Sequence, residues 1–246
     1  MTDTGRMQGV MNMGGRKNNR LDKNAGVIKG KEKESLSDVA YQAVLQGLFD
    51  RIVPVGAFVS QSKLVELLGV PIQPLRDALR VLEAEGVLEI HPRSGIQFLK
   101  PDLELIRSTY QFRTLIEKAA VRHFAEMGDA ETAVNLLEEH RDVVGLIEKN
   151  DIDQDILERI EGLEQSLHGN IIASMNNPLI ENTGRRLKNY VVLIRLERLI
   201  TKPLALRSLK EHIAILEACV ARDADRAEAA VADHFHAAMQ RILGFI

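Results

Sequence analysis

The fold of the first part of this chain is decided by the stretch SQSKLVELLGVPIQPLRDALRVLEAEGVLEI, residues 60–90. Ser60 is a suitable N-cap for a short helix, and Gly69 suits the left-handed position that closes such a helix. A turn of a few residues leads to a second helix, expected over about residues 73–85. Pro74 falls in the first turn of this helix, where backbone N–H groups have no helical partner. The pattern therefore predicts two short helices joined by a tight turn.

The second helix separates into two faces when its residues are placed about 100° apart. One face is apolar and is expected to be buried, with Leu75, Ala78, Leu79 and Leu82. The opposite face is polar, and its side chains lie one turn apart on a single stripe: Gln73, Arg76, Asp77 and Arg80. A short helix pair with an exposed Arg/Gln face is the arrangement that enters the DNA major groove. There, arginine can bond guanine or phosphate, and glutamine can bond adenine.

Two short alternating segments follow the helix pair, and another helix, over residues 36–50, precedes it. Residues 87–90 and 96–99 are expected to form a small hairpin, or wing, whose tip contains Arg93 and Gly95. This tip can approach a phosphate or the minor groove closely. A solvated helix face remains the alternative for the helix pair by itself, and the hairpin favours DNA binding.

The segment resembles the winged helix-turn-helix of GntR-type transcription regulators. The resemblance is carried by Pro54-Val55-Gly56, residues 64–70, 74–79 and 82–88, and the Gly95 turn. It implies that Arg76 contacts the operator. The family usually has Ser-Arg-Thr before its helix proline, whereas this chain has Pro71-Ile72-Gln73, so a capping hydroxyl and one arginine are missing. The expected DNA-contacting residues are Lys63, Gln73, Arg76, Arg80, Arg93 and Gly95.

The rest of the chain contains apolar residues at helical spacing, and we expect no strand after Asp102. Turn residues such as Gly128-Asp129 and Asn176-Asn177-Pro178 divide it into long helices. Long helices with short connections favour an antiparallel bundle. The expected helices cover residues 102–126, 130–149, 152–174, 178–199, 204–221 and 224–243.

Polar side chains are expected on the buried faces of three of these helices. Glu164 and His168 lie four residues apart and share an apolar face, while His212 and His234 each fall among apolar residues. His236 should face away. Imidazoles and a carboxylate inside a bundle can meet around a divalent metal. A single histidine on an apolar face is more often a hydrogen-bonded core residue, and this alternative stays open.

Residues 103–243 resemble the FCD ligand-binding domain of the FadR-like GntR subgroup. The family has an acidic residue four before a histidine, then a Glu-His pair, then a last histidine 22 residues on, which here are Glu211-His212 and His234. The resemblance implies a divalent metal, zinc first and nickel or manganese as chemically admissible alternatives. It also implies that a small organic acid binds beside the metal. The expected ligands are Glu164, His168, His212 and His234, with Glu164 in place of the usual Asp.

Arg113 has two interpretations. It lies on the inward stripe of its helix and matches an arginine of the resembled family, so it could hold a carboxylate of the effector bidentately, through two of its three guanidinium nitrogens. Glu117 follows four residues later, so an internal ion pair is equally compatible with the sequence. We therefore name Arg113 as the candidate effector-binding residue and leave the ion pair open.

Composition and charge limit the classes of protein. The chain has 246 residues, a net charge of −3 and 45% hydrophobic residues, as in an ordinary folded protein. Its single cysteine excludes an internal disulfide, and we expect no membrane span and no signal peptide. Residues 1–34 have eight basic and four acidic side chains, which suggests a disordered basic arm. The expected domains are therefore 1–34, the winged helix over 35–100, and the helical bundle over 101–246.

These features predict a cytoplasmic, homodimeric transcription regulator, expected to be a repressor, rather than an enzyme. Its partners would be double-stranded operator DNA and a small carboxylate metabolite, with no membrane partner. One alternative is a metabolite-binding dimer whose DNA binding is weakened or lost, because residues 71–73 depart from the family pattern. The other is a metal-dependent enzyme, which is disfavoured because no additional acid or base with motif support lies near the expected ligands.

Overall fold

The computed structural model describes residues 35–196 and 200–244. The expected basic arm over residues 1–34 and the last residues of the helix expected over 178–199 lie outside the described residues. In the part of the chain described, no helix is long and apolar enough to span a bilayer. The first elements are α1 (Leu36–Phe49), β1 (Phe58–Val59), α2 (Gln61–Leu68), α3 (Ile72–Ala84), β2 (Leu88–His91) and β3 (Gly95–Phe98). The helices that follow are α4 (Leu103–Met127), α5 (Ala130–Lys149), α6 (Gln154–Ala173), α7 (Pro178–Arg195), α8 (Lys202–Val220) and α9 (Ala224–Leu243).

The predicted helix pair is α2 and α3, and its ends follow the expected local chemistry. The Ser60 side chain accepts a hydrogen bond from the backbone N–H of Lys63, which caps α2. Gly69 closes α2 at φ 65°, a left-handed conformation that favours glycine. Pro71 occupies the N-cap of α3 and makes no side-chain capping bond. The departure from the family pattern at residues 71–73 thus leaves the start of α3 without a capping hydroxyl.

The wing is one strand larger than the sequence predicted. β2 and β3 form the expected antiparallel hairpin, and β1 pairs with the other edge of β3 to give the order β1-β3-β2. β1 has only two residues, which is too short to produce a detectable alternation. Gly95 begins β3 where a Cβ atom would lie 2.9 Å from the Phe58 ring and 3.0 Å from the Val59 carbonyl oxygen. A side chain at position 95 would therefore push β1 away from the wing.

The N-terminal core forms on the apolar face of α3, as its periodicity predicts. The predicted residues Leu75, Ala78, Leu79 and Leu82 are all buried. They pack with buried residues of α1 and of the strands in one cluster. Because this packing fixes the rotation of α3 about its axis, the opposite stripe of polar residues faces outward.

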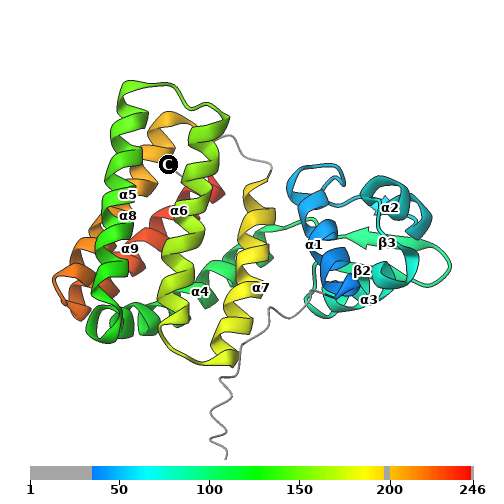
Figure 1. Cartoon of the computed structure of the whole chain (residues 1–246), viewed down its shortest axis with the longest axis horizontal. Coiled ribbons are helices and arrows are strands. Elements are labelled where there is room, and N and C mark those ends of the chain that lie inside the picture. The colour runs from blue at the N-terminus through cyan, green and yellow to red at the C-terminus, as the bar shows by residue number, and fades with distance from the viewer. Residues whose placement is uncertain (1–34, 197–199, 245–246) are drawn as a thin grey trace, which may run out of the picture. The chain divides into compact units, whose positions relative to one another are not determined.

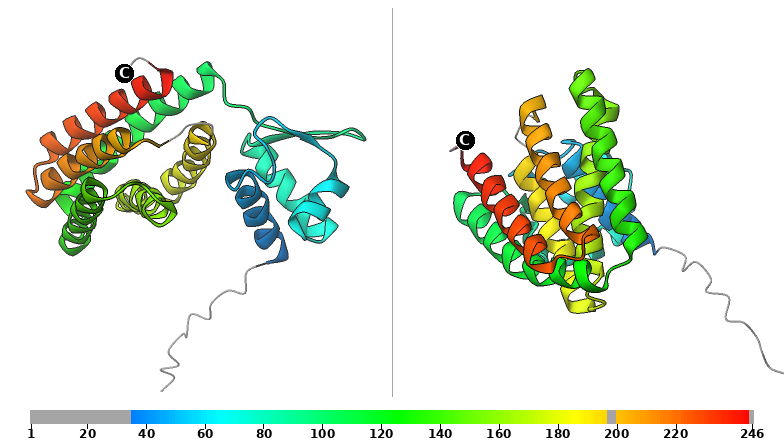
Figure 2. Two further views of the ribbon diagram at one scale, coloured as in Figure 1. Left: turned by 90° about the horizontal axis from the view of Figure 1, so that it is seen from above. Right: turned by 90° about the vertical axis from the view of Figure 1, so that its left-hand side faces the viewer.

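The remaining helices form an all-helical bundle, as predicted (Figure 1). α4 packs along α9, α8 contacts both α9 and α5, and α6 contacts α4 and α5 (Figure 2). α8 begins two residues earlier than expected, because Pro203 lies in its first turn, where a proline is tolerated. The bundle therefore surrounds its interior with faces of α4, α5, α6, α8 and α9.

The interior of the bundle contains two apolar clusters with polar residues between them. Along α6, Leu163 belongs to one cluster and Leu167 to the other, and Glu164 lies between them. Along α8, Leu209 and Ile215 flank His212 in the same way. Since buried polar groups are costly unless they are paired, this level of the bundle is where a functional site is expected.

Candidate metal centre and DNA-contacting face

The four metal ligands expected from the sequence meet inside the bundle. α6 supplies Glu164 and His168, α8 supplies His212, and α9 supplies His234. Each can offer one donor atom, and these four atoms all lie within 4.8 Å of one another. The three histidines are buried and Glu164 is nearly so. Three imidazoles and one carboxylate at this spacing form a donor set that suits a divalent transition metal.

Each of the three imidazoles has a hydrogen-bond partner at Nδ1. The Nδ1 atom of His168 lies 2.5 Å from Oε2 of Glu117, and that of His234 lies 2.9 Å from Oε2 of Glu211. The Nδ1 atom of His212 lies 3.3 Å from Nε2 of His140. A carboxylate can only accept, so Glu117 and Glu211 assign the Nδ1 protons to His168 and His234.

The Nε2 atoms of the same histidines are buried and make no hydrogen bond. The Nε2 atom of His212 lies 3.4 Å from Oε2 of Glu164, and that of His168 lies 3.6 Å from Oε1. Unprotonated nitrogens that face a carboxylate in a buried interior repel it, and a buried acceptor without a partner is costly. A cation bound by these atoms would relieve both costs. The donor set therefore fits a metal ion on the grounds of its own chemistry.

Burial favours the neutral form of His140, His212 and His234, and neutral imidazole is the form that ligation requires. Burial lowers the pKa of His212 to about 3, and burial together with the neighbouring His212 lowers the pKa of His140 to about 4. Burial also lowers the pKa of His234 below its ordinary value. Neutral imidazole nitrogens have a free lone pair near pH 7, so proton competition for the metal is weak.

The carboxylate of Glu164 is held ionised by basic side chains. Burial by itself would raise its pKa, but the nearby guanidinium of Arg195 holds the pKa well below the ordinary range. The guanidinium of Arg195, on α7, lies 3.0 Å from Oε1 of Glu164, and that of Arg113 lies 3.8 Å away. Glu164 is thus available as an anionic ligand over the whole physiological pH range.

Arg113 forms the internal ion pair that the sequence left open. Its Nε atom donates to Oε1 of Glu117 at 2.7 Å, and both side chains are buried. Burial opposes the ionisation of Glu117, but Arg113 and His168 lower its pKa to about 2. The guanidinium also lies over the ring of Phe235, 4.7 Å from the centroid. One of its nitrogens, Nη1, makes no hydrogen bond, so Arg113 retains a donor beside the candidate metal ligands.

Glu211 connects the site to α9. Burial raises its pKa, but hydrogen bonds from His234 and Arg241 lower the pKa to about 2. Arg241 donates from both terminal nitrogens to the two carboxylate oxygens, at 2.6 and 2.7 Å. This bidentate pair fixes the carboxylate that orients His234.

Several residues that complete the site were not predicted from the sequence. His140 on α5 could have been found, because it shares an apolar stripe with Leu136, Val143 and Ile147. Glu117 was considered only as a partner of Arg113. Arg195 gave no local signal, since its partner Glu164 lies 31 residues earlier on another helix.

The expected DNA-contacting residues lie at the surface of the N-terminal half. Gln73, Arg76 and Arg80 are exposed on α3, and Arg93 is exposed at the wing tip at φ 64°. The Nε atom of Arg76 donates to Oε1 of Gln61 on α2 at 3.1 Å, a contact that the sequence analysis missed. Lys63 is paired with Glu66 at 2.8 Å. Their exposure makes these side chains available for the predicted contact with DNA.

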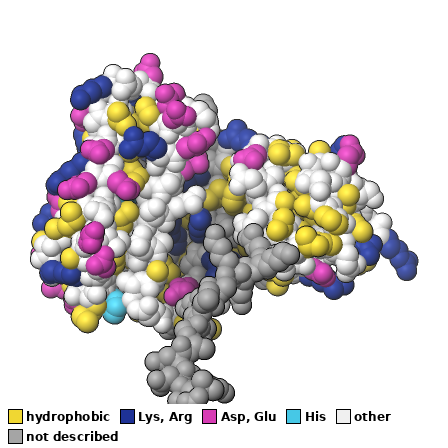
Figure 3. All heavy atoms as spheres, in the orientation of Figure 1, with side chains coloured by type: hydrophobic (Ala, Val, Ile, Leu, Met, Phe, Trp, Pro, Cys, Tyr) yellow, Lys and Arg dark blue, Asp and Glu magenta, His cyan; other side chains and the backbone are white. Residues whose placement is uncertain are grey.

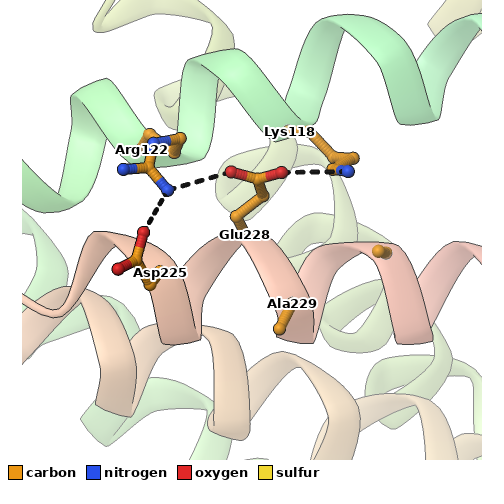
Figure 4. A pocket seen from close by; sticks show the side chains of 6 residues that line it. Lys118, Arg122, Asp225, Glu228 and Ala229 are labelled. Atoms are coloured by element: carbon orange, nitrogen blue, oxygen red, sulfur yellow. Dashed lines mark hydrogen bonds and ion pairs between the residues drawn. The ribbon is translucent and has the colours of Figure 1, made fainter.

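A surface hollow between α4 and α9 was not predicted, and its charges are already paired. Its volume is about 360 Å³, and Arg122 contacts Asp225 and Glu228 while Lys118 contacts Glu228 (Figure 4). On the face drawn in Figure 3, basic and acidic side chains are interspersed over the C-terminal helices. These exposed pairs leave no uncompensated charge of one sign, so the buried cluster is the stronger candidate for a small ligand.

Comparison with known families and proteins matches both halves of the chain. The family model described as "Bacterial regulatory proteins, gntR family" matches residues 36–98. The model described as "FCD domain" matches residues 108–237, which is more than half of the chain. The metal-ligand candidates and Arg113 all fall within the second match.

Individual relatives are distant. A Bacillus subtilis (strain 168) protein named "Uncharacterized HTH-type transcriptional regulator YdhC" is 22% identical over 196 residues, covering 80% of this chain and 86% of the relative. Among solved structures, E. coli McbR/YncC has a TM-score of 0.70 at 19% identity, over 85% of this chain and 98% of that one. A putative transcriptional regulator GntR from Rhodococcus sp. RHA1 has a TM-score of 0.68 at 18% identity, over 85% and 97%. At these identities, the solved structures support the fold alone.

Proposed function

This chain belongs to the GntR family of bacterial regulatory proteins and contains an FCD domain, and from this premise we propose how its two halves work together. The family consists of DNA-binding transcription regulators and not of enzymes. We propose a homodimeric repressor that binds a palindromic operator through α3 and the wing. A divalent metal and a small organic acid, bound in the helical half, would modulate that binding. A protein that regulates transcription must share the compartment of the DNA, so we place it in the cytoplasm.

The observation that carries the sensing part is the set of buried Nε2 atoms of His168, His212 and His234. They make no hydrogen bonds and face the carboxylate of Glu164. We propose that these four residues hold the metal, with zinc as the first expectation and nickel or manganese as alternatives. When bound, the metal would supply a Lewis acid that can accept an oxygen atom of an organic acid.

Charge balance supports an anionic effector. Within the site, the positive Arg113 and Arg195 balance the negative Glu117 and Glu164, and Arg241 balances Glu211. A divalent cation would therefore leave two positive charges without side-chain compensation in a dry interior. Buried charge that is not paired is costly, so a carboxylate ligand would be favoured. The Nη1 atom of Arg113, which makes no hydrogen bond, is the donor we assign to that carboxylate.

In the DNA-binding part, α3 would enter the major groove and the wing would lie against the adjacent backbone. Arg76, held from α2 by Gln61, would read a base or clamp a phosphate. Two copies are required to read a palindrome, which is the reason for proposing the dimer. A ligand can change operator affinity only if it binds two states of the dimer differently.

Gel retardation of the DNA upstream of this chain's own gene tests the proposal. The metal-loaded protein should retard that DNA, and candidate carboxylic acids should change the retardation. A protein that binds acids but retards neither this DNA nor a library of genomic fragments would be a metabolite-binding dimer without operator binding.

The metal ligands are tested separately by elemental analysis of the purified protein. Replacing both His168 and His212 by Ala should remove the metal, because the site loses half of its donors. The matched control is His236→Ala, which removes an exposed imidazole from α9. Full metal retention by the double variant would show that the ligands lie elsewhere.

A further inference from the structure

His140 is a buried histidine that touches the metal site without belonging to its donor set. It is 0% exposed on α5, between Leu137 of one apolar cluster and Val143 of the other. Its Nδ1 atom lies 2.7 Å from the carbonyl oxygen of Leu136, and its Nε2 atom lies 3.3 Å from Nδ1 of His212. The two rings meet edge to face, with centroids 5.3 Å apart. Both nitrogens of His140 are therefore engaged.

These contacts determine where the protons lie. The carbonyl of Leu136 can only accept, so Nδ1 of His140 carries the proton and its Nε2 atom presents a lone pair. That lone pair accepts from Nδ1 of His212, which places the proton of His212 on Nδ1. The Nε2 atom of His212 is then unprotonated and faces Glu164. One backbone carbonyl thus sets the tautomer of a donor residue through an intervening imidazole.

The other two donor histidines are oriented differently. His168 and His234 each donate from Nδ1 to a carboxylate, Glu117 and Glu211 respectively. Those carboxylates add negative charge beside the site, whereas His140 orients its partner without adding charge. A third carboxylate at this position would offset much of the positive charge that the metal brings. The attraction of the site for an anion would then be weaker.

We propose that His140 is a positioning residue of the metal site, which selects the metal-binding tautomer of His212 while leaving the site's charge unchanged. This inference rests on the proposed metal site and adds a residue outside its donor set. Without Nε2 of His140 as an acceptor, Nδ1 of His212 has no partner that favours one of the two neutral tautomers of His212 over the other. The protonated-Nε2 form can then donate to Glu164, which blocks two donor atoms at once.

Two substitutions separate the acceptor from the volume of the ring. His140→Leu removes the acceptor and keeps an apolar side chain in the core, whereas His140→Gln retains an oxygen that can accept from His212. We expect His140→Leu to weaken the affinity for Zn²⁺, measured by chelator competition on the metal-free protein, by about 10- to 100-fold. His140→Gln should recover most of the affinity. His236→Leu, at an exposed position of α9, serves as the control and should bind as tightly as the unsubstituted protein.

A spectroscopic signature distinguishes tautomer selection from a merely structural role. Nitrogen-15 spectra of the metal-free protein should show His212 protonated at Nδ1, and the His140→Leu variant should show a mixture of tautomers. Unchanged Zn²⁺ affinity in His140→Leu, or His212 protonated at Nε2 in the unsubstituted protein, would overturn the inference. If His140→Leu fails to fold, the spectrum of the unsubstituted protein still decides. If the unsubstituted protein binds no metal, the proposed function is wrong, whereas the tautomer of His212 can still be measured.

Discussion

The two halves of this chain share the same helical periodicity, but their candidate functional side chains lie on opposite faces of the helices, exposed in the first half and buried in the second. On α3, Arg76 and Arg80 lie on the exposed stripe, and the buried stripe is entirely apolar. On α6 and α8, the functional side chains lie on the buried stripe, among leucine and isoleucine. The N-terminal half is thus arranged for a large partner that comes to its surface, and the C-terminal half for a ligand small enough to enter.

The difference has an energetic consequence. Exposed arginines interact with water when they have no partner, so they can be exchanged with little effect on folding. The buried groups have exchanged water for one another, and each depends on its partner for compensation. Function and stability are therefore separable in the first half and coupled in the second.

The strongest test of this contrast removes one buried charge. Glu117→Gln keeps the volume of the side chain but removes the carboxylate that lies closest to Arg113 and His168. We expect the free energy of unfolding, measured by denaturant titration, to fall by about 3–5 kcal/mol. The control Glu138→Gln, at an exposed position of α5, should change it by less than about 0.5 kcal/mol. Equal effects in the two variants would show that the buried network does not depend on its charges.

The single thiol lies in the C-terminal half, on α8. Cys219 is buried, and burial raises its pKa to about 12, so the folded chain presents almost no thiolate at pH 8. Alkylation by iodoacetamide should therefore require opening of the bundle. Zn²⁺ at a hundred times its Kd should slow alkylation about 100-fold. Operator DNA should slow alkylation less than Zn²⁺ does. Equal slowing of alkylation by the two ligands would show that the two halves open together.

The same thiol gives a pH dependence with a definite sign. Its folded pKa of about 12 lies above the ordinary value of 9.0, so between these values the unfolded chain ionises while the folded chain does not. This contribution to stability is complete below pH 9 and is lost as the pH rises toward 12. The difference in unfolding free energy between the unsubstituted protein and Cys219→Ala should shrink over that range. A constant difference would mean that the thiol is accessible to water.

In the N-terminal half, Arg76→Ala should affect function and leave folding unchanged. Loss of one guanidinium contact should weaken operator binding by about 1–3 kcal/mol, or roughly 10- to 100-fold, measured by gel retardation. Helical content and thermal midpoint should stay as in the unsubstituted protein. Arg141→Ala provides the control, because this arginine pairs with Glu217 on the helical half. Unaltered retardation by Arg76→Ala would remove this residue from the proposed DNA contacts.

The smallest expected effect concerns the N-cap at Ser60, where α2, the first helix of the pair, begins. Ser60→Ala removes the side-chain acceptor for the N–H of Lys63 and should lower the unfolding free energy by about 1 kcal/mol. Ser62→Ala, at an exposed position inside α2, loses no cap and should not destabilise the protein. A larger loss in Ser62→Ala than in Ser60→Ala would contradict the assigned start of α2.

Much of the fold followed from local patterns. The cap at Ser60, the closing Gly69 and the apolar stripe from Leu75 to Leu82 gave α2, α3 and the rotation of α3. The wing hairpin was also predicted, but β1 was not, because two residues form a strand only when β3 is present beside them. Most helix ends differ from the expected ones by one or two residues, where terminal hydrogen bonds are few, whereas α7 ends at Arg195, four residues before the expected position 199.

The sequence alone determined that Glu164, His168, His212 and His234 face inward, because helical periodicity fixes the direction in which each side chain leaves its helix. Only the tertiary structure decided which inward groups meet. The contact between His140 and His212 joins residues 72 positions apart, and that between Arg195 and Glu164 joins α7 to α6. Such contacts depend on the offset and rotation of one helix against another. These are set by the packing of the entire bundle, and no local pattern contains them.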